Sequence, residues 1–152
     1  MFEFLGNLVI GISIAAVSSW ITVQLSRKKF RTERLWEKKI DAYERLIEAL
    51  HQSKKFSSEH LIAEIKSRDI DEARDFELRK LAQAAREVID RAADIGGFVM
   101  SEKSVAIVKN YQSEAEKLDT CQFWYEYIDM DHTITERCLN RVIQAAKEDL
   151  ER

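Results

Sequence analysis

The sequence predicts an all-α protein, in which one N-terminal transmembrane helix continues into a cytosolic helical bundle. The chain of 152 residues has no proline and only four glycines, whereas strand-rich folds need many turns built from those two residues. An uncharged apolar stretch fills residues 4–26, and apolar residues recur at helical spacing beyond it. We expect a transmembrane segment within residues 1–26, a basic juxtamembrane part and first cytosolic helix in residues 27–56, and the rest of the bundle in residues 57–152.

Residues 4–26 are long enough to cross a membrane. The stretch contains 23 uncharged residues, and a helix needs about 20 apolar residues to span the hydrocarbon core. A cleaved signal peptide is the alternative, but it requires basic residues before the apolar stretch, where this chain has only the acidic Glu3. Positive charges follow the stretch instead, and cytoplasmic flanks collect lysine and arginine. We therefore expect the N-terminus outside the cell and the C-terminal domain in the cytosol.

The charges of the chain are divided unevenly. Residues 27–39 hold seven basic and two acidic residues, whereas the whole chain has a net charge of −3. The part after residue 39 is therefore acidic, which does not fit a general nucleic-acid binder. A basic block beside an apolar helix is typical of contact with the lipid bilayer surface. The residues expected at that surface are Arg27, Lys28, Lys29 and Arg31.

Small and polar residues follow one face of the membrane segment. They recur at steps of three or four residues, which is the spacing of a single helical face. Lipid gains nothing from such a face, whereas a neighbouring helix does, because small residues allow close approach. Three interpretations stay open: packing between copies in a homo-oligomer, the lining of a water-filled pore, and the general richness of membrane helices in small residues. The residues are Asn7, Gly11, Ala15, Ser18, Thr22 and Ser26.

The first cytosolic helix is predicted by apolar residues that repeat at steps of four and three, which is the spacing of a bundle or coiled-coil seam. We expect Ser57 and Ser58 to end it, because serine caps helices, and a short helix to follow over residues 61–65. The seam consists of Trp36, Ile40, Tyr43, Ile47 and Leu50.

Three further helices are predicted by their caps. One is expected to begin at residues 69–71 and to stop at Gly96 and Gly97, since glycine is common at helix C-termini. Another follows Ser101, and the last is expected to begin after the capping box of Thr133 and Glu136. The expected apolar face of the first of these helices runs through Ala73, Phe76 or Leu78, Leu81, Ala85, Val88, Ala92 and Ile95.

A group of aromatic residues stands close together near residue 125. Consecutive aromatic side chains on a helix cannot all face one core, so some of them are expected to meet another helix, a partner or a ligand. The alternative is that a small bundle uses them as large core anchors. The candidates for partner binding are Phe123, Trp124, Tyr125 and Tyr127.

Motifs for cofactor or metal chemistry are absent from the sequence. It has no glycine-rich phosphate loop, no HExxH and no GxSxG. The two cysteines, Cys121 and Cys138, have no zinc-ligand spacing, and in a cytosolic domain they are expected to be reduced and packed. We expect no cofactor and no metal site, and we expect a non-enzymatic protein.

One pattern allows a catalytic alternative. Arg45 and His51 are separated by five residues, and this spacing resembles the signature of HEPN ribonucleases, although Leu46 stands where that family has a polar residue. In such an enzyme the histidine would act as general base, and the arginine would stabilise phosphate charge. The simpler alternative is that Arg45 pairs on the helix surface with Asp41 or Glu48.

The layout also resembles a group of bacterial membrane proteins. The segments that carry the resemblance are residues 34–50, residues 95–101 and the aromatic cluster at residues 124–127. The layout is similar to uncharacterised bacterial single-pass membrane proteins and to the small membrane accessory proteins of type VI-B CRISPR antiphage systems, which form helical rings with a divergent HEPN-like domain. The resemblance implies a bacterial inner-membrane location and an antiviral role.

We therefore expect an oligomeric inner-membrane effector, which forms a pore or depolarises the membrane during phage defence. A membrane-tethered ribonuclease that uses Arg45 and His51 is one alternative. A membrane-anchored helical scaffold that recruits a cytosolic defence protein is the other. The expected partners are the lipid bilayer, further copies of the chain and that cytosolic protein, with nucleic acid not expected.

Overall fold

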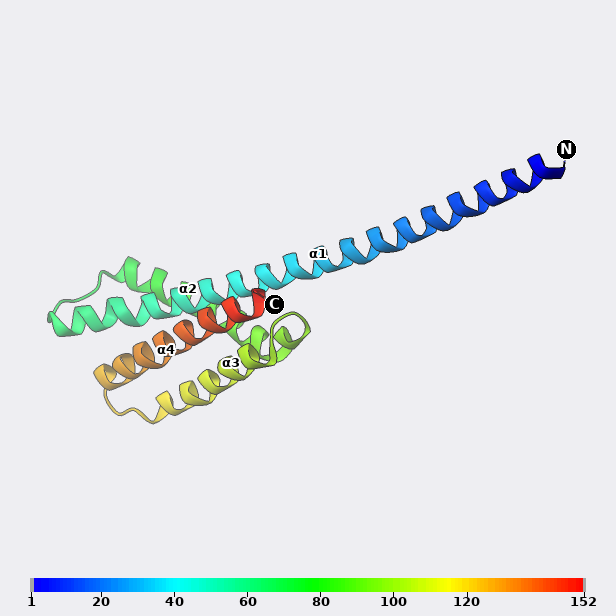
Figure 1. The fold of residues 1–152 in the computed structure, drawn as a ribbon. Coiled ribbons are helices and arrows are strands. Elements are labelled where there is room, and N and C mark those ends of the chain that lie inside the picture. Colours follow the sequence, from blue (N-terminus) through cyan, green and yellow to red (C-terminus); the bar gives the residue numbers. More distant parts are fainter. Residues whose placement is uncertain (1, 152) are drawn as a thin grey trace. The chain divides into compact units, whose positions relative to one another are not determined.

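The computed structural model describes the backbone of residues 2–151 and the side chains of Ser26, Phe30 and residues 32–151. Within these residues it consists of four α-helices and two short 3-10 turns, with no strand (Figure 1). This confirms the all-α class. The helices are α1 (Phe2–Ile65), α2 (Glu72–Ile95), α3 (Glu102–Ala115) and α4 (Trp124–Leu150), and the turns are η1 (Gly96–Phe98) and η2 (Glu116–Thr120).

The chain divides into two units, residues 1–37 and residues 38–152. In the first unit, the side chains of Phe30, Leu35 and Trp36 are exposed, and the Arg34 guanidinium lies 5.2 Å from the centre of the Phe30 ring. The predicted membrane segment lies outside the described side chains, except for Ser26. Among the residues that were described, no helix combines the length and apolar character required to span a bilayer.

The second unit is an up-and-down bundle built from α2, α3, α4 and the part of α1 that begins at Lys38. Bonds between α1 and α4 show that these helices run antiparallel. Lys39 Nζ lies 3.0 Å from Asp149 Oδ1 at one end, and Lys54 Nζ lies 2.6 Å from Glu136 Oε1 farther along. The C-terminal end of α4 therefore lies beside the start of this part of α1 (Figure 1).

Similar bonds join the other neighbouring helices of the bundle. Arg74 of α2 pairs with Glu59 of α1, and Gln112 of α3 donates a hydrogen bond of 2.7 Å to Asp90 of α2. Two ion pairs connect α3 to α4 near opposite ends of α3. They are Lys103 with Glu148, at 2.6 Å, and Arg137 with Glu114, at 2.9 Å.

One hydrophobic core lies between the four helices. The predicted seam of α1 contributes Tyr43 and Leu50 to it, but Leu46 and Ala49 complete the buried face in place of Ile40 and Ile47, which are half-buried. Trp36 belongs to the first unit and is exposed. The other helices contribute apolar side chains at helical spacing, including Leu78, Ala85 and Ile89 of α2, Ile107 and Val108 of α3, and Ile134, Leu139 and Val142 of α4.

Two predicted helix boundaries are wrong. Ser57 does not end a helix, because α1 continues to Ile65 and the buried Ser57 hydroxyl donates to the backbone carbonyls of Ser53 and Lys54. A serine that bonds the preceding turn in this way can stay inside a helix. The last helix begins at Trp124 rather than after the capping box, so Thr133 lies inside α4, and Glu136 pairs with Lys54.

Three other boundaries are confirmed. The Asp71 side chain accepts a hydrogen bond from the backbone N–H of Arg74 at the start of α2, and Ser101 does the same for Ser104 at the start of α3. α2 ends before Gly96, as expected, but this glycine has a helical φ of −58°. A Cβ at Gly96 would meet the terminal methyl of Met100, the far end of a flexible side chain that can shift to make room.

Candidate functional site

The residues of the ribonuclease alternative lie on the surface of α1. The Arg45 guanidinium binds the Asp41 carboxylate one turn earlier, with N–O distances of 3.1 and 3.0 Å, as the surface-pair alternative predicts. His51 is exposed. No described acid, base or hydroxyl is bonded to both residues, so the arrangement within one copy is that of a solvated helix surface.

The residues predicted for the membrane lie largely outside the described part. Ser26 is exposed, and the other members of the small-residue stripe (Asn7, Gly11, Ala15, Ser18 and Thr22) have no described side chain. The same holds for Arg27, Lys28, Lys29 and Arg31. Their proposed roles therefore still depend on the spacing of these residues in the sequence.

The predicted aromatic cluster lies at the N-terminal end of α4. Phe123 is the residue before the helix and is 70% exposed, and Tyr125 is also exposed. Trp124 and Tyr127 stack on each other with 5.6 Å between ring centres, and Tyr127 is half-buried. The cluster therefore divides into a part that packs against the bundle and a part that is exposed to solvent, and partner binding by the exposed part stays a prediction.

The packed part of the cluster surrounds a buried histidine that the sequence analysis did not single out. His60 of α1 is 6% exposed. The Trp124 ring meets it edge-on at 5.4 Å between ring centres, and the Phe56 ring lies 4.4 Å away. The spacing of four residues between Phe56 and His60 could have suggested their contact, but nothing in the sequence links His60 to α4.

His60 also faces charged groups of α2. Its Nε2 lies 3.2 Å from Asp75 Oδ1. Neither atom has a hydrogen-bond partner among the described residues, so the two atoms are close together without forming a hydrogen bond. Arg79 holds Asp75 through a bond of 2.7 Å and lies over the Trp124 and Phe56 rings. Burial lowers the pKa of His60, and the Arg79 charge adds to this effect while Asp75 opposes it. His60 is therefore held as neutral imidazole.

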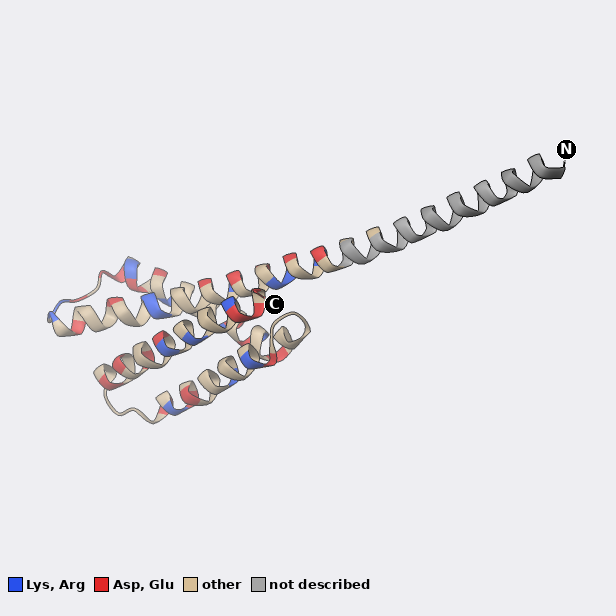
Figure 2. Ribbon diagram, viewed as in Figure 1, with Lys and Arg blue, Asp and Glu red and all other residues tan. Residues whose placement is uncertain are grey.

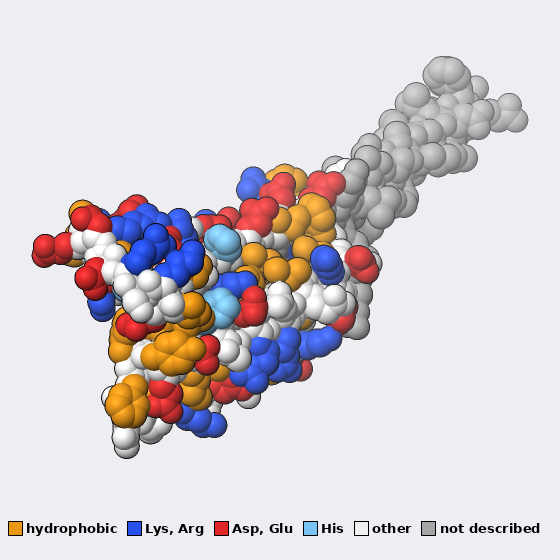
Figure 3. Space-filling view, turned by 90° about the vertical axis from the view of Figure 1, so that its left-hand side faces the viewer, with side chains coloured by type: hydrophobic (Ala, Val, Ile, Leu, Met, Phe, Trp, Pro, Cys, Tyr) orange, Lys and Arg blue, Asp and Glu red, His pale blue; other side chains and the backbone are white. Residues whose placement is uncertain are grey.

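The end of the bundle that carries this cluster exposes large apolar side chains. Figure 3 views that end and shows hydrophobic side chains gathered beside a group of basic ones. Large exposed apolar side chains come from the end of α1, the start of α2 and the start of α4. They are Ile62, Ile65, Phe76, Phe123, Trp124 and Tyr125.

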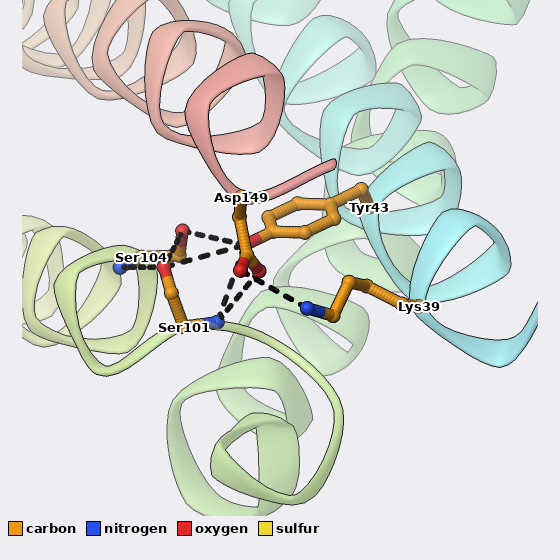
Figure 4. A network of polar contacts seen from close by, with 5 residues as sticks. All are labelled: Lys39, Tyr43, Ser101, Ser104 and Asp149. Carbon is orange, nitrogen blue, oxygen red and sulfur yellow. Dashed lines mark hydrogen bonds and ion pairs between the residues drawn. The ribbon is translucent and has the colours of Figure 1, made fainter. Parts of the chain in front are cut away.

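A second polar cluster lies at the opposite end of the bundle, where α1, α3 and α4 meet (Figure 4). The Tyr43 hydroxyl donates to Asp149 Oδ2 at 2.8 Å and lies 2.8 Å from the Ser104 hydroxyl. The same carboxylate accepts from the backbone N–H of Ser101 at 3.1 Å and pairs with Lys39. Every member of the cluster therefore has a partner inside the bundle.

The electrostatics of Asp149 follow from these bonds. Burial alone would raise the pKa of its carboxyl group, but the hydrogen bonds from Tyr43 and Lys39 and the Lys39 charge outweigh burial and lower it. An ionised carboxylate that accepts three bonds fixes the start of α3 against two other helices. The cluster is suited to joining elements rather than to chemistry on a substrate.

A further buried carboxyl group lies in the N-terminal third of α4. Asp131 is 4% exposed. Burial raises its pKa, while a hydrogen bond with Ser57 and the charge of Arg86 oppose that rise. Arg86 in turn bonds to Tyr127, and both residues line a hollow of about 340 Å³ between α2, α3 and α4.

Both cysteines are free thiols; Cys138 is packed as expected, whereas Cys121 is only half-buried. Cys138 is buried, and burial raises its pKa to about 12, so the thiol stays protonated and unreactive. Among the described residues, no three His, Cys, Asp or Glu side chains come together in a way that could hold a metal ion.

No protein-family model, curated protein or solved structure matches this chain. The function therefore has to be inferred from the chemistry of the chain's own residues.

Proposed function

We propose that the protein is a membrane-anchored effector that self-associates and acts on the bacterial inner membrane. The observation that carries this proposal is the sequence of residues 4–26, in which 23 uncharged residues carry small and polar side chains at steps of three and four. A basic block follows directly, which favours a cytosolic C-terminal domain. Membrane helices with such a face associate through close backbone approach and hydroxyl hydrogen bonds.

Several polar groups of the described residues are engaged within the chain. The bonds of the Asp149 cluster point inward and join helices, and Arg45 is engaged by Asp41. Acidic and basic residues alternate along the helices of the bundle (Figure 2), with no single basic stripe of the kind that nucleic-acid binders carry on the described helices. The concrete form of the proposal, suggested by the resemblance in layout, is that assembled copies permeabilise or depolarise the membrane during phage defence.

The test is membrane integrity in cells that express the full-length protein. When expression is strong or triggered, cells should take up a normally excluded dye or lose membrane potential. Gly11→Ile should reduce both the oligomer and this effect, because a branched side chain separates helices where they touch. Leu8→Ile is the matched control on another face of the segment and should change neither.

Two results would contradict the proposal. One is a wild-type protein that is monomeric in mild detergent. The other is protection of cells from phage while the membrane potential stays intact. The second result would favour the scaffold function instead.

A membrane-anchored scaffold is the second candidate, and the exposed aromatic side chains at the start of α4 favour it. Phe123 and Tyr125 reach solvent, whereas the neighbouring Trp124 and Tyr127 stack against each other. Replacing Phe123 and Tyr125 together by serine should leave the fold intact. If the protein is a scaffold, this variant should lose its biological effect while its oligomeric state is unchanged, and a membrane effector should keep the effect.

A further inference from the structure

The hollow of about 340 Å³ beside Arg86 and Tyr127 is lined by residues of α2, α3, η2 and α4. Its buried lining is largely apolar, because Ile89, Tyr111 and Leu118 line it and are almost fully buried. An apolar lining with a few polar groups around it is the usual composition of a small-molecule site, and sites of this volume take small ligands. The hollow can therefore receive a molecule of metabolite size.

One wall of the hollow presents a guanidinium without an ion pair. Arg86 of α2 bonds to the hydroxyl of Tyr127, which is uncharged, and the charge of the buried Asp131 acts on it from beyond ion-pair distance. No carboxylate of the described residues is paired with Arg86. A guanidinium has five N–H donors, so the bond to Tyr127 leaves donors for a carboxylate, which arginine binds through two parallel bonds.

Three carboxylates line the same hollow without a cation. Asp90 of α2 accepts a hydrogen bond of 2.7 Å from the Gln112 amide. Glu116 and Asp119 of η2 form no side-chain bond with any described residue. Among the described residues, these carboxylates do not form a group that could hold a metal ion together. They therefore suit an organic cation whose charges are spread over its length.

The opposite charges of the hollow are held apart. Asp90 follows Arg86 by four residues, the spacing at which ion pairs form on a helix surface. Instead, Tyr127 of α4 bonds to Arg86, and Gln112 of α3 bonds to Asp90. The space between the two charges stays open, and a ligand that carries both charges can bridge it.

We propose that this hollow binds a free α-amino acid with a cationic side chain, of the lysine and ornithine class. The α-carboxylate of the ligand binds Arg86, and its two ammonium groups face Asp90 and the carboxylates of η2. One negative and two positive charges on the ligand complement the one cation and three carboxylates that line the hollow. The same carboxylates repel acidic ligands, which makes the site selective. This site goes beyond the proposed membrane function and does not depend on it.

Isothermal titration calorimetry of the full-length protein in mild detergent tests the site, with L-lysine as the probe. L-lysine should bind at millimolar or lower concentration, whereas L-glutamate should not bind. Cadaverine is lysine without the α-carboxylate, so it cannot use Arg86. It should bind about tenfold more weakly than lysine or worse, because a hydrogen bond between charged groups contributes at least that factor.

Two variants assign the charges of the ligand to the two walls. Arg86→Gln keeps an amide that can donate to Tyr127 but removes the charge. It should weaken lysine binding by about tenfold or more, for the same reason, and should not weaken cadaverine binding. Asp119→Asn, at an exposed position of η2, should weaken the binding of both probes.

The matched controls are Arg91→Gln and Asp94→Asn, which make the same charge changes at exposed positions of α2 outside the hollow. Both should bind lysine and cadaverine as the wild type does. The circular dichroism spectrum shows whether each variant keeps its helices. If Arg86→Gln loses them, Asp119→Asn carries the test, because its position in the exposed turn is not part of the core.

Three results would overturn the proposal. One is a wild-type protein that does not bind L-lysine at millimolar concentration. Another is equal binding of lysine and cadaverine, which would show a site for organic cations without a role for Arg86. The third is lysine binding that survives in both folded variants, which would place the ligand elsewhere. None of these results bears on the membrane effector, which depends on residues 4–26.

Discussion

At the residue scale, the bond between Tyr43 and Asp149 carries a testable part of the stability of the bundle. Tyr43→Phe keeps the ring in the core and removes the hydroxyl that joins Asp149 to Ser104. Asp149 keeps its bonds to Lys39 and Ser101, so the loss is that of one hydrogen bond to a charged group, which contributes about 1.5–3 kcal/mol. We expect the melting temperature of the full-length protein to fall by several degrees.

Tyr125→Phe is the control for this prediction, because it removes a hydroxyl from an exposed tyrosine and should leave the melting temperature unchanged. Equal melting temperatures for wild type and Tyr43→Phe would show that the cluster contributes little.

His60 predicts how stability changes with pH. Burial lowers its pKa in the folded protein below the ordinary value. When pH falls below about 6.5, the unfolded chain therefore takes up a proton before the folded chain does. Stability is full above that pH and decreases as pH falls below it.

The measurement for His60 is the melting temperature between about pH 7.5 and 5.5, a window in which histidine is the side chain that ordinarily titrates. His60→Phe should flatten the profile in that window, while His51→Gln, at an exposed position, should leave it unchanged. A profile that is identical in wild type and His60→Phe would contradict this assignment.

The ribonuclease alternative makes its own prediction at the residue scale. A surface substitution such as His51→Ala usually changes stability by no more than about 0.5 kcal/mol, so the variant should fold. We expect it to keep the full biological effect, because Arg45 is engaged by Asp41. Loss of the effect together with loss of RNA cleavage by the purified full-length protein would establish the nuclease instead.

At the element scale, local caps were predictable from the sequence and long-range choices were not. Asp71 and Ser101 act through their own next turn, so their roles can be read from a few neighbouring residues. Thr133 and Glu136 have the same spacing as a cap, but Glu136 binds Lys54 of α1. That contact joins residues far apart in the sequence, so local spacing could not reveal it.

The buried face of α2 shows the same limit. The sequence left Phe76 or Leu78 open, and Leu78 is the buried one. Ala85 lies in the core as predicted, but Val88 and Ile95 are exposed, and Ile89 and Ala93 are buried in their place. Both sets have helical spacing, and the choice between them depends on which helices pack beside α2. The Asp149 cluster was missed for a related reason, since it brings together three helices.

The cap of α2 gives a prediction at this scale. Asp71→Ala removes the acceptor for the Arg74 N–H, and the loss of such a cap costs about 0.5–2 kcal/mol. We expect a lower melting temperature of the full-length protein. Asp69→Ala, two residues earlier at an exposed position, should have no comparable effect, and similar losses in both variants would argue against the cap.

At the scale of the whole molecule, the expected orientation in the membrane can be tested directly. A reporter enzyme that works only in the cytoplasm should be active when it is fused after Arg152. Neutralising the four basic residues Arg27, Lys28, Lys29 and Arg31 together should weaken or invert the orientation, because lysine and arginine bias sets it. Activity of a reporter that works only in the periplasm, fused at the same site, would overturn the proposed topology.

The meeting of α1 with the end of α4 sets the order in which the protein can fold during synthesis. Chains emerge from the ribosome N-terminus first, so Tyr43 is made long before Asp149, its partner in the cluster. Until the last turn of α4 is released, the nascent chain cannot form the bonds that hold α1, α3 and α4 together. A chain that is released before Asp149 has been added would therefore carry Tyr43 and Ser101 without the carboxylate that joins them.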